Sequence, residues 1–159
     1  MNVIKKALIK VVGKMSRPMM EHTFGMIGDL CRAFYEKNGK EALPIIAEVA
    51  SKSGARRAEI MQKMMPVKDM KDVGELFKMM GMMMDIGIEI VELSDDAIHI
   101  KVPKCTLGIE GTSRELCEAI MMALDTKMVS TLLRQEVETK ILKSVAAGDK
   151  ECEVIFSKK

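Results

Sequence analysis

The sequence predicts an α+β fold in which N-terminal helices precede a β-hairpin, a helical crossover and a second β-hairpin. Through the first 84 residues, apolar side chains recur at the three- and four-residue spacing of helices. From Ile86 the apolar period changes to two, and it returns to two in the last twenty residues. Two hairpins that flank a helix can pair into one antiparallel sheet covered by helices on one face.

Length and composition restrict the classes of protein to which this chain can belong. With 159 residues we expect one domain, 1–159, with a helical part at 1–85 and a β-α-β part at 86–159. The 25 basic and 23 acidic residues nearly balance, and aromatic residues make up only 3%, which argues against a nucleic-acid partner. Four cysteines without a secretory signal predict a reduced, cytoplasmic setting. No apolar run is long enough for a membrane span.

Two helices are expected before residue 38. The first, from Val3 to Met15, places one apolar face opposite a row of lysines, and that face comprises Ile4, Leu8, Val11 and Met15. Pro18 should interrupt the helical pattern. A second helix over 21–37 should turn its apolar side chains to the core, namely Phe24, Ile27, Leu30, Cys31 and Phe34.

Two further helices are expected between residues 41 and 85. The third runs from Glu41 to Met65, with Pro44 in its first turn and Gly54 marking a bend or a break. Asp69 or Asp72 can cap the fourth helix. This helix has the clearest apolar stripe in the chain: Val73, Leu76, Phe77, Met80, Met83 and Met84.

The chain is rich in methionine, with 17 such residues. Methionine is flexible and polarisable, so it fills irregular cores and also lines adaptable binding surfaces. Either an ordinary core or a dedicated apolar pocket therefore explains the methionines of the fourth helix.

The second half alternates strands with a helix. Ile86, Ile88 and Ile90 alternate with polar or small residues, and a turn at 94–96 leads to the strand Ile98–Val102. Thr112 and Glu115 fit a capping box, and the helix that follows should point Cys117, Ile120, Met121 and Leu124 inward. A final hairpin is expected at 137–145 and 151–156.

Three cysteines lie near the ends of these elements: Cys105 after a strand, Cys117 in a first helical turn, and Cys152 at the start of the last strand. Such thiols could converge on a metal or reactive site, and Cys105, Cys117 and Cys152 are the candidate metal ligands. Their spacing is not that of a CxxC ribbon or a zinc finger, and buried cysteine is also common in ordinary cores. His99 is out of phase with Ile98 and should face the other side of the sheet.

The second half, from Ile86 to Phe156, resembles the 4-vinyl reductase domain, a small-molecule-binding module also described as hydrocarbon-binding. The resemblance rests on the run from Cys105, on the helix with Cys117, and on the ending Ala146-Ala147-Gly148-Asp149-Lys150-Glu151-Cys152. The domain is related to small subunits of the transport-particle vesicle-tethering complex. A similar ending occurs in the family named for L-2-amino-thiazoline-4-carboxylate hydrolase, which supplies a hydrolase alternative.

The resemblance also implies a possible zinc site. In phenol-sensing members, zinc is held by a helix cysteine, a strand glutamate, a second strand cysteine and a final cysteine. Cys117 matches the first ligand and Cys152 the last, but Ile141 and Ser144 stand at the middle positions. Cys105 could replace one thiolate, and Glu138 or a water the other ligand. The sensors also use histidine and tryptophan in their pockets, and this chain has no tryptophan, so phenol does not carry over as the ligand.

From the resemblance we expect a non-enzymatic protein that binds or senses an apolar small molecule. The predicted ligand-binding residues are Phe24, Phe77, Met80, Met83, Met84 and Met121. Members of the group commonly dimerise, so a homodimer is expected, with the first helix offering a face for it. No output domain is evident in the sequence, so a signal would pass to a partner protein. A structural or assembly module, acting only through its helix faces, is the third alternative.

Overall fold

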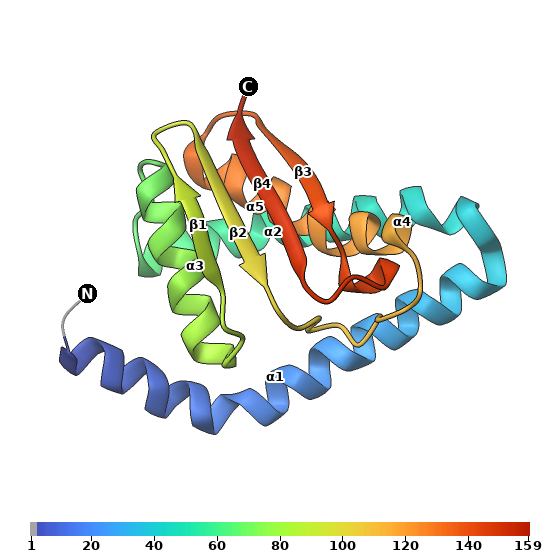
Figure 1. The fold of residues 1–159 in the computed structure, drawn as a ribbon, viewed down its shortest axis with the longest axis horizontal. Coiled ribbons are helices and arrows are strands. Elements are labelled where there is room, and N and C mark those ends of the chain that lie inside the picture. The colour runs from blue at the N-terminus through green and yellow to red at the C-terminus, as the bar shows by residue number, and fades with distance from the viewer. Residues whose placement is uncertain (1–2) are drawn as a thin grey trace.

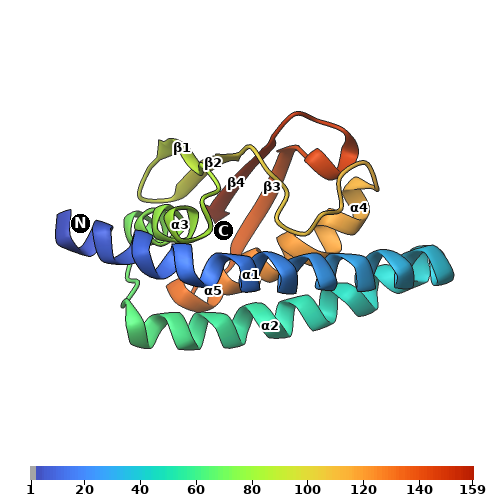
Figure 2. The ribbon, with the colours of Figure 1, turned by 90° about the horizontal axis from the view of Figure 1, so that it is seen from below.

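The computed structural model describes the backbone of residues 3–159 and the side chains of residues 7–159. The centre of the molecule is an antiparallel sheet, and the helices lie on one side of it (Figure 1, Figure 2). Its strands stand in the order β1 (Glu89–Leu93), β2 (Ala97–Val102), β4 (Cys152–Lys158) and β3 (Val137–Lys143). The predicted α+β fold, with two hairpins joined into one sheet, is therefore confirmed.

The first two predicted helices form one helix, α1, which spans Val3–Asn38 without a break. The expected interruption at Pro18 is wrong, because proline removes one backbone hydrogen bond and bends a helix more often than it ends one. The helix bends in its first half (Figure 1), and Arg17 pairs there with Asp85 at 2.9 Å. Ile4, one member of the predicted apolar face, lies outside the described side chains.

The helix α2 (Ala42–Met64) follows a short 3-10 turn, η1 (Gly39–Glu41), and returns antiparallel to α1 (Figure 2). Pro44 lies in the first turn of α2, as predicted. Gly54 does not break the helix, which is continuous across it. It is buried, and a Cβ added there would collide with the backbone of Leu124 on α5 (Ala123–Leu133). The glycine allows two helix backbones to approach closely.

The helix α3 (Met70–Met84) packs against α1 and the β1–β2 hairpin. Asp69 caps it by accepting a hydrogen bond from the backbone N–H of Asp72 at 2.9 Å, so one of the two predicted caps is confirmed. After α3, strand β1 begins only at Glu89. Ile86 and Ile88, which the sequence predicted to be in a strand, precede it and point instead into a cavity described below.

The crossover between the hairpins is helical but irregular. Ser113, rather than Thr112, caps α4 (Arg114–Cys117) by accepting a hydrogen bond from Leu116 N–H at 3.1 Å. The predicted cap was therefore one residue too early. A π-helical turn, η2 (Glu118–Met122), joins α4 to α5. Turns of this kind are wider than α-helix and often occur at functional sites.

The pairing of β2 with β4 shows which side chains face the helices and which face away from them. Ile98 pairs with Phe156 and Val102 with Cys152 across β2 and β4, and the side chains of Ile98, Val154 and Phe156 are buried under the helices. His99 lies on the opposite face, where its Nε2 is 2.9 Å from Oε1 of Glu153. The predicted separation of His99 from the buried face is confirmed.

Candidate functional site

An apolar cavity lies where α1, α3, the helical crossover and the ends of β2 and β4 meet. Its volume is about 100 Å³. The β-sheet contributes Ile100, Val102, Val154 and Phe156 to its wall, and α3 with the segment after it contributes Phe77, Met80, Met84, Ile86 and Ile88. The wall is therefore built mainly from branched aliphatic, aromatic and methionine side chains. Only a few polar groups reach it, which is the usual composition of a small-molecule site.

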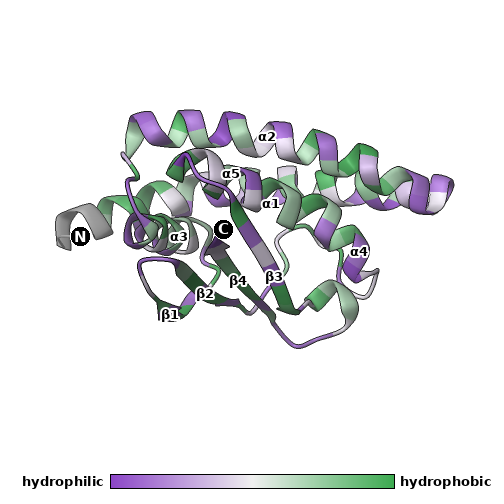
Figure 3. Cartoon of the chain, turned by 90° about the horizontal axis from the view of Figure 1, so that it is seen from above, coloured by the Kyte–Doolittle hydropathy of each residue, from purple (hydrophilic) through white to green (hydrophobic). Residues whose placement is uncertain are grey.

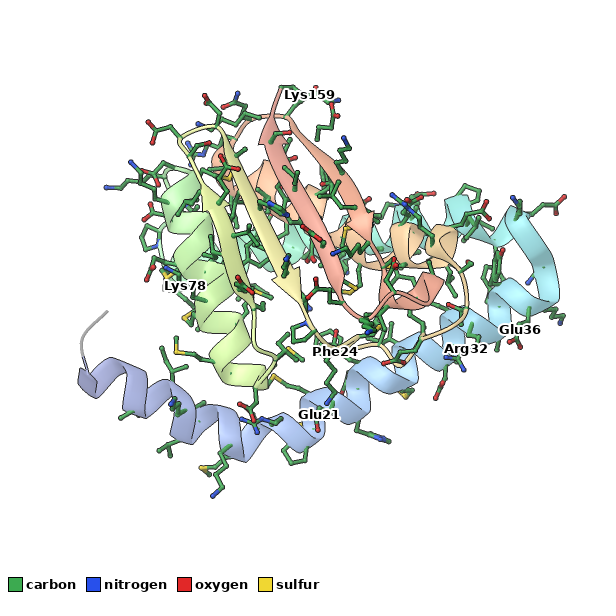
Figure 4. All side chains as sticks on the ribbon, in the orientation of Figure 1. Glu21, Phe24, Arg32, Glu36, Lys78 and Lys159 are labelled. Carbon is green, nitrogen blue, oxygen red and sulfur yellow. The ribbon has the colours of Figure 1, made fainter. Side chains whose placement is uncertain are left out.

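Five of the six predicted ligand-binding residues line this cavity: Phe24, Phe77, Met80, Met84 and Met121. Phe24 projects from α1 toward the rest of the molecule (Figure 4). The sixth, Met83, does not line it. The backbone of Met83 is instead packed against Gly13 of α1, where an added Cβ would lie 2.9 Å from its Cα.

The sequence prediction missed several residues of the cavity wall. The alternation along β2 and β4 already identified the buried face, so Ile100, Val102, Val154 and Phe156 could have been included. Asp125 was missed as well, although it follows Cys117 and Met121 at a spacing of four residues. That spacing places an acidic side chain on an apolar helix face, a signal that sequence reasoning could have used.

The three candidate metal ligands, Cys105, Cys117 and Cys152, all line the same cavity. The pKa of Cys117 is raised to about 11, mainly by burial; the hydroxyl of Ser144 opposes this increase, and the neighbouring Cys152 and Cys105 contribute to it. Burial also raises the pKa of Cys152, opposed by the N–H of Val145, which donates to its Sγ at 3.4 Å. Because the thiolate is the nucleophile, protonated thiols of this kind are poor catalysts at neutral pH.

The other residues of the implied zinc site are placed less favourably. Ile141 has no donor atom, and Ser144 brings a buried hydroxyl beside Cys117. Glu138 is exposed on β3 and is not part of the cavity wall. Within residues 7–159, no three or more His, Cys, Asp or Glu side chains are grouped as they would be around a metal ion. The thiols offer at most three donors, and zinc at these positions stays a prediction.

Asp125 is the unusual polar group of the cavity wall. Its side chain is buried, with 8% of the residue exposed, and its Oδ1 has no hydrogen-bond partner among the described residues. Burial raises the pKa of Asp125 to about 6, against the opposing charge of Arg57. The guanidinium of Arg57 lies over the ring of Phe24, with Cζ 5.7 Å from the ring centre. Arg57, Lys104 and Asp125 thus bring two positive charges and one negative charge to a mainly apolar wall.

A wider depression between α5 and β3 has a volume of about 680 Å³ but a different character. It is a shallow, open groove, and its lining includes Arg114, Glu118, Lys127, Glu136 and Lys140. Such a solvated, charged surface gives an apolar molecule little area to bury. The smaller cavity is therefore the candidate functional site.

The fold and the cavity together define an α+β protein with an apolar chamber between a four-stranded sheet and its helices. No protein-family model matches the chain, and no curated protein matches its sequence. Solved structures do share its fold. Among the helices of residues 3–159, none has the length and apolar character needed to cross a membrane.

Two similar structures illustrate the fold. The phenol-responsive sensory domain of the transcription activator PoxR, solved with phenol, is 13% identical at a TM-score of 0.63, over 85% of this chain and 74% of that chain. A trafficking protein particle complex subunit 3 from Naegleria fowleri, covalently bound to palmitic acid, is 15% identical at a TM-score of 0.61, over 92% of this chain and 96% of that one. At such identities the likeness establishes the fold alone.

Proposed function

We propose that this chain is a non-enzymatic small-molecule-binding protein of the 4-vinyl reductase type, which encloses an apolar molecule in the cavity between α3, the crossover and the sheet. The observation that carries the proposal is the apolar cavity itself, with Phe24, Phe77, Met80, Met84 and Met121 in its wall. Supporting it, one similar structure was solved with phenol and another with covalently bound palmitic acid.

The size of the cavity restricts what can bind without rearrangement. A volume of about 100 Å³ suits a molecule with the size of a single small ring. A longer ligand would require side chains to move, and the four methionines of the wall, Met80, Met84, Met121 and Met122, can do so at low cost because the thioether chain is flexible. Burial of the ligand would contribute about 25 cal/mol per Å² of apolar surface, before the entropic cost of binding.

The polar groups favour binding over catalysis. A cysteine hydrolase requires a base beside its thiol, but the pKa of Cys117 is raised rather than lowered. The two histidines lie elsewhere, His22 exposed on α1 and His99 on the outer face of the sheet.

Ligand-induced stabilisation tests the proposal. Toluene should raise the melting temperature of the wild-type protein, because it binds only the folded state. Val102→Phe fills part of the cavity and should abolish this increase. Val91→Phe is the matched control, since Val91 is 43% exposed on β1 and outside the cavity. An equal effect of toluene on both variants, or no effect of either toluene or benzyl alcohol on the wild type, would contradict the proposal.

A homodimer accompanies this proposal. Hydrophobic and hydrophilic residues alternate along α1 and α2 (Figure 3), and several large apolar side chains of these two helices are more than half exposed. They are Leu8, Val11, Met15, Met19, Leu30, Ile45, Val49, Ile60 and Met64.

Three residues of α1 that the sequence predicted to face the core are exposed instead. Leu30 is 63% exposed, and Ile27 and Phe34 are each 37% exposed, so the prediction was wrong for them. The apolar residues of α1 lie on several sides of the helix, and only one side of a helix can pack against the rest of its own domain.

We also propose that ligand occupancy is read by a partner protein in the cytoplasm. If the cavity proves unable to bind apolar molecules while the α1 and α2 surface still forms a dimer, the assembly-module alternative would account for the chain better.

A further inference from the structure

Asp125 has no evident structural role in the wall of the apolar cavity. The residues around it there are mostly apolar, and they include Met121, Met122 and Phe156. Within the described part of the chain, its Oδ1 is buried and accepts no hydrogen bond. A buried carboxylate without partners is costly, so a side chain of this kind in a core calls for an explanation. Its position in the wall of the candidate ligand cavity suggests one.

We propose that the ligand of this cavity is an apolar molecule with one hydrogen-bond donor, a hydroxyl or an amine, which donates to Oδ1 of Asp125. This inference rests on the proposed function and names the chemical class of its ligand. The apolar body would lie against Phe77, Met80 and Met84, and the donor would point to α5.

The charges of the cavity wall select among the possible head groups. Arg57 already brings a positive charge near Asp125, so the ligand need not be a cation to compensate the carboxylate. A ligand carboxylate placed next to Asp125 would bring two like charges together in a medium of low dielectric, which is unfavourable at that point of the wall even though Arg57 and Lys104 also line the cavity. A pure hydrocarbon would leave Oδ1 unpaired and would displace any water that pairs with it, so it forfeits a hydrogen bond.

The hydrogen-bond donor of the ligand should increase its affinity over that of a hydrocarbon by an amount that can be estimated. A hydrogen bond to a charged acceptor contributes on the order of 1.5–3 kcal/mol, which corresponds to roughly a tenfold to hundredfold difference in affinity. A site that is built to pair with one polar group rejects the analogue that lacks it, because its own buried atom is then left unpaired. The carboxylate would therefore discriminate alcohols and amines from hydrocarbons of the same shape.

Two probes of similar shape test the inference, benzyl alcohol and toluene. The measured quantity is the dissociation constant of toluene divided by that of benzyl alcohol, for the wild type and for Asp125→Leu. This ratio cancels the different hydration of the two probes. It should fall at least tenfold in Asp125→Leu. Glu138→Leu, which removes an exposed carboxylate outside the cavity, is the control and should leave the ratio unchanged.

The possible outcomes separate the two proposals. If both probes bind and the ratio differs by less than twofold between the wild type and Asp125→Leu, the donor inference is wrong and the binding proposal stands. If neither probe binds the wild type, both are wrong.

A measurement on the wild type alone covers the case in which Asp125→Leu does not fold. The carboxyl carbon resonance of Asp125 is followed by NMR between pH 4 and 8. Benzyl alcohol should lower the apparent pKa of Asp125, because its hydroxyl favours the charged form, and toluene should not. Among the other groups that line the cavity, Cys117 and Cys152 interfere little, because burial raises the pKa of each thiol and keeps both protonated over this range. An equal response to both probes would overturn the inference.

Discussion

Gly54 on α2 lies directly against the backbone carbonyl of Leu124 on α5. A Cβ built on Gly54 would overlap that carbonyl oxygen and lie 3.0 Å from the carbonyl carbon. Close by, the hydroxyl of Ser51 donates to the carbonyl of Ala123 at 3.4 Å. This close approach fixes the position of α5 at the residue immediately before Asp125. The contact between α2 and α5 therefore determines where the carboxylate meets the cavity.

Replacing Gly54 should destabilise the protein. Gly54→Ala forces two helix backbones apart, and we expect a loss of about 1–3 kcal/mol in the free energy of unfolding. Gly25→Ala is the control, because a Cβ at Gly25 would meet nothing within 4 Å. In the middle of α1 that alanine should stabilise the protein by up to about 1 kcal/mol. Urea unfolding of both variants measures the difference, and equal stability of the two would show that α2 and α5 are not in close contact.

The stability of the protein should depend on the ionisation of Asp125. Its pKa rises from 3.8 to about 6 on folding, so the folded state holds the proton more tightly than the unfolded chain does. The contribution of Asp125 to stability is therefore greatest below pH 4, and it falls as the pH rises from about 4 to 6. Asp125→Asn replaces the carboxyl by an uncharged amide, so its stability should not decrease over this pH range.

Asp125→Asn should accordingly be more stable than the wild type at pH 7, by up to about 3 kcal/mol, with the advantage vanishing near pH 4. Thermal unfolding from pH 4 to pH 8 tests the difference. An advantage for Asp125→Asn that does not change with pH would mean that the carboxyl does not titrate in this range.

Cys117 should be unreactive toward alkylating reagents. With its pKa near 11, the thiolate fraction at pH 8 is roughly a hundredfold smaller than for a cysteine at its ordinary value of 9.0. Mass spectrometry after brief treatment with iodoacetamide should find Cys117 unmodified in the folded protein and fully modified in urea. Rapid labelling of Cys117 in the folded protein at pH 8 would contradict this and would reopen the hydrolase alternative.

Zinc, if it binds, should depend on the thiols of the cavity. Elemental analysis of the purified protein would then find about one zinc per chain, and Cys117→Ser or Cys152→Ser should abolish it, because each removes a donor. Cys31→Ser should retain the metal, since Cys31 does not line the cavity. Binding would release protons, as thiols with raised pKa values must lose them first. A protein without zinc after refolding with excess metal would eliminate the predicted site.

The exposed apolar surface of α1 and α2 should mediate self-association. Leu30→Glu and Val49→Glu place charges at residues that are each 63% exposed, and either change should convert a dimer into a monomer. Leu142→Glu, at a residue 39% exposed on β3, should leave the dimer intact. Light scattering coupled to size-exclusion chromatography gives the mass directly. A wild-type protein that is monomeric at high concentration would dismiss the dimer proposal.

Sequence patterns predicted much of this structure because helices and strands have fixed periods. The stripe of α3 and the alternation of β2 and β4 identified the buried faces, so the helical period alone was enough to assign Phe77, Met80 and Met84 to one surface. The same reasoning failed at Pro18, where one lost hydrogen bond did not end α1. A helical period also does not show that the backbone of Met83, which shares the stripe of α3, lies against Gly13 of α1.

The sequence by itself determined the α+β class, the order of the elements and the inward faces that carry Cys117 and Cys152, because these depend on residues a few positions apart. Only the tertiary structure brought Cys105, Cys117 and Cys152 into one cavity and placed Asp125 in the wall of that same cavity. That arrangement depends on how closely α2 approaches α5 at Gly54 and on the register of β2 with β4. Both are contacts between segments that are far apart in the sequence. The periodic spacing of apolar residues within one helix or strand contains no information about how close such segments come.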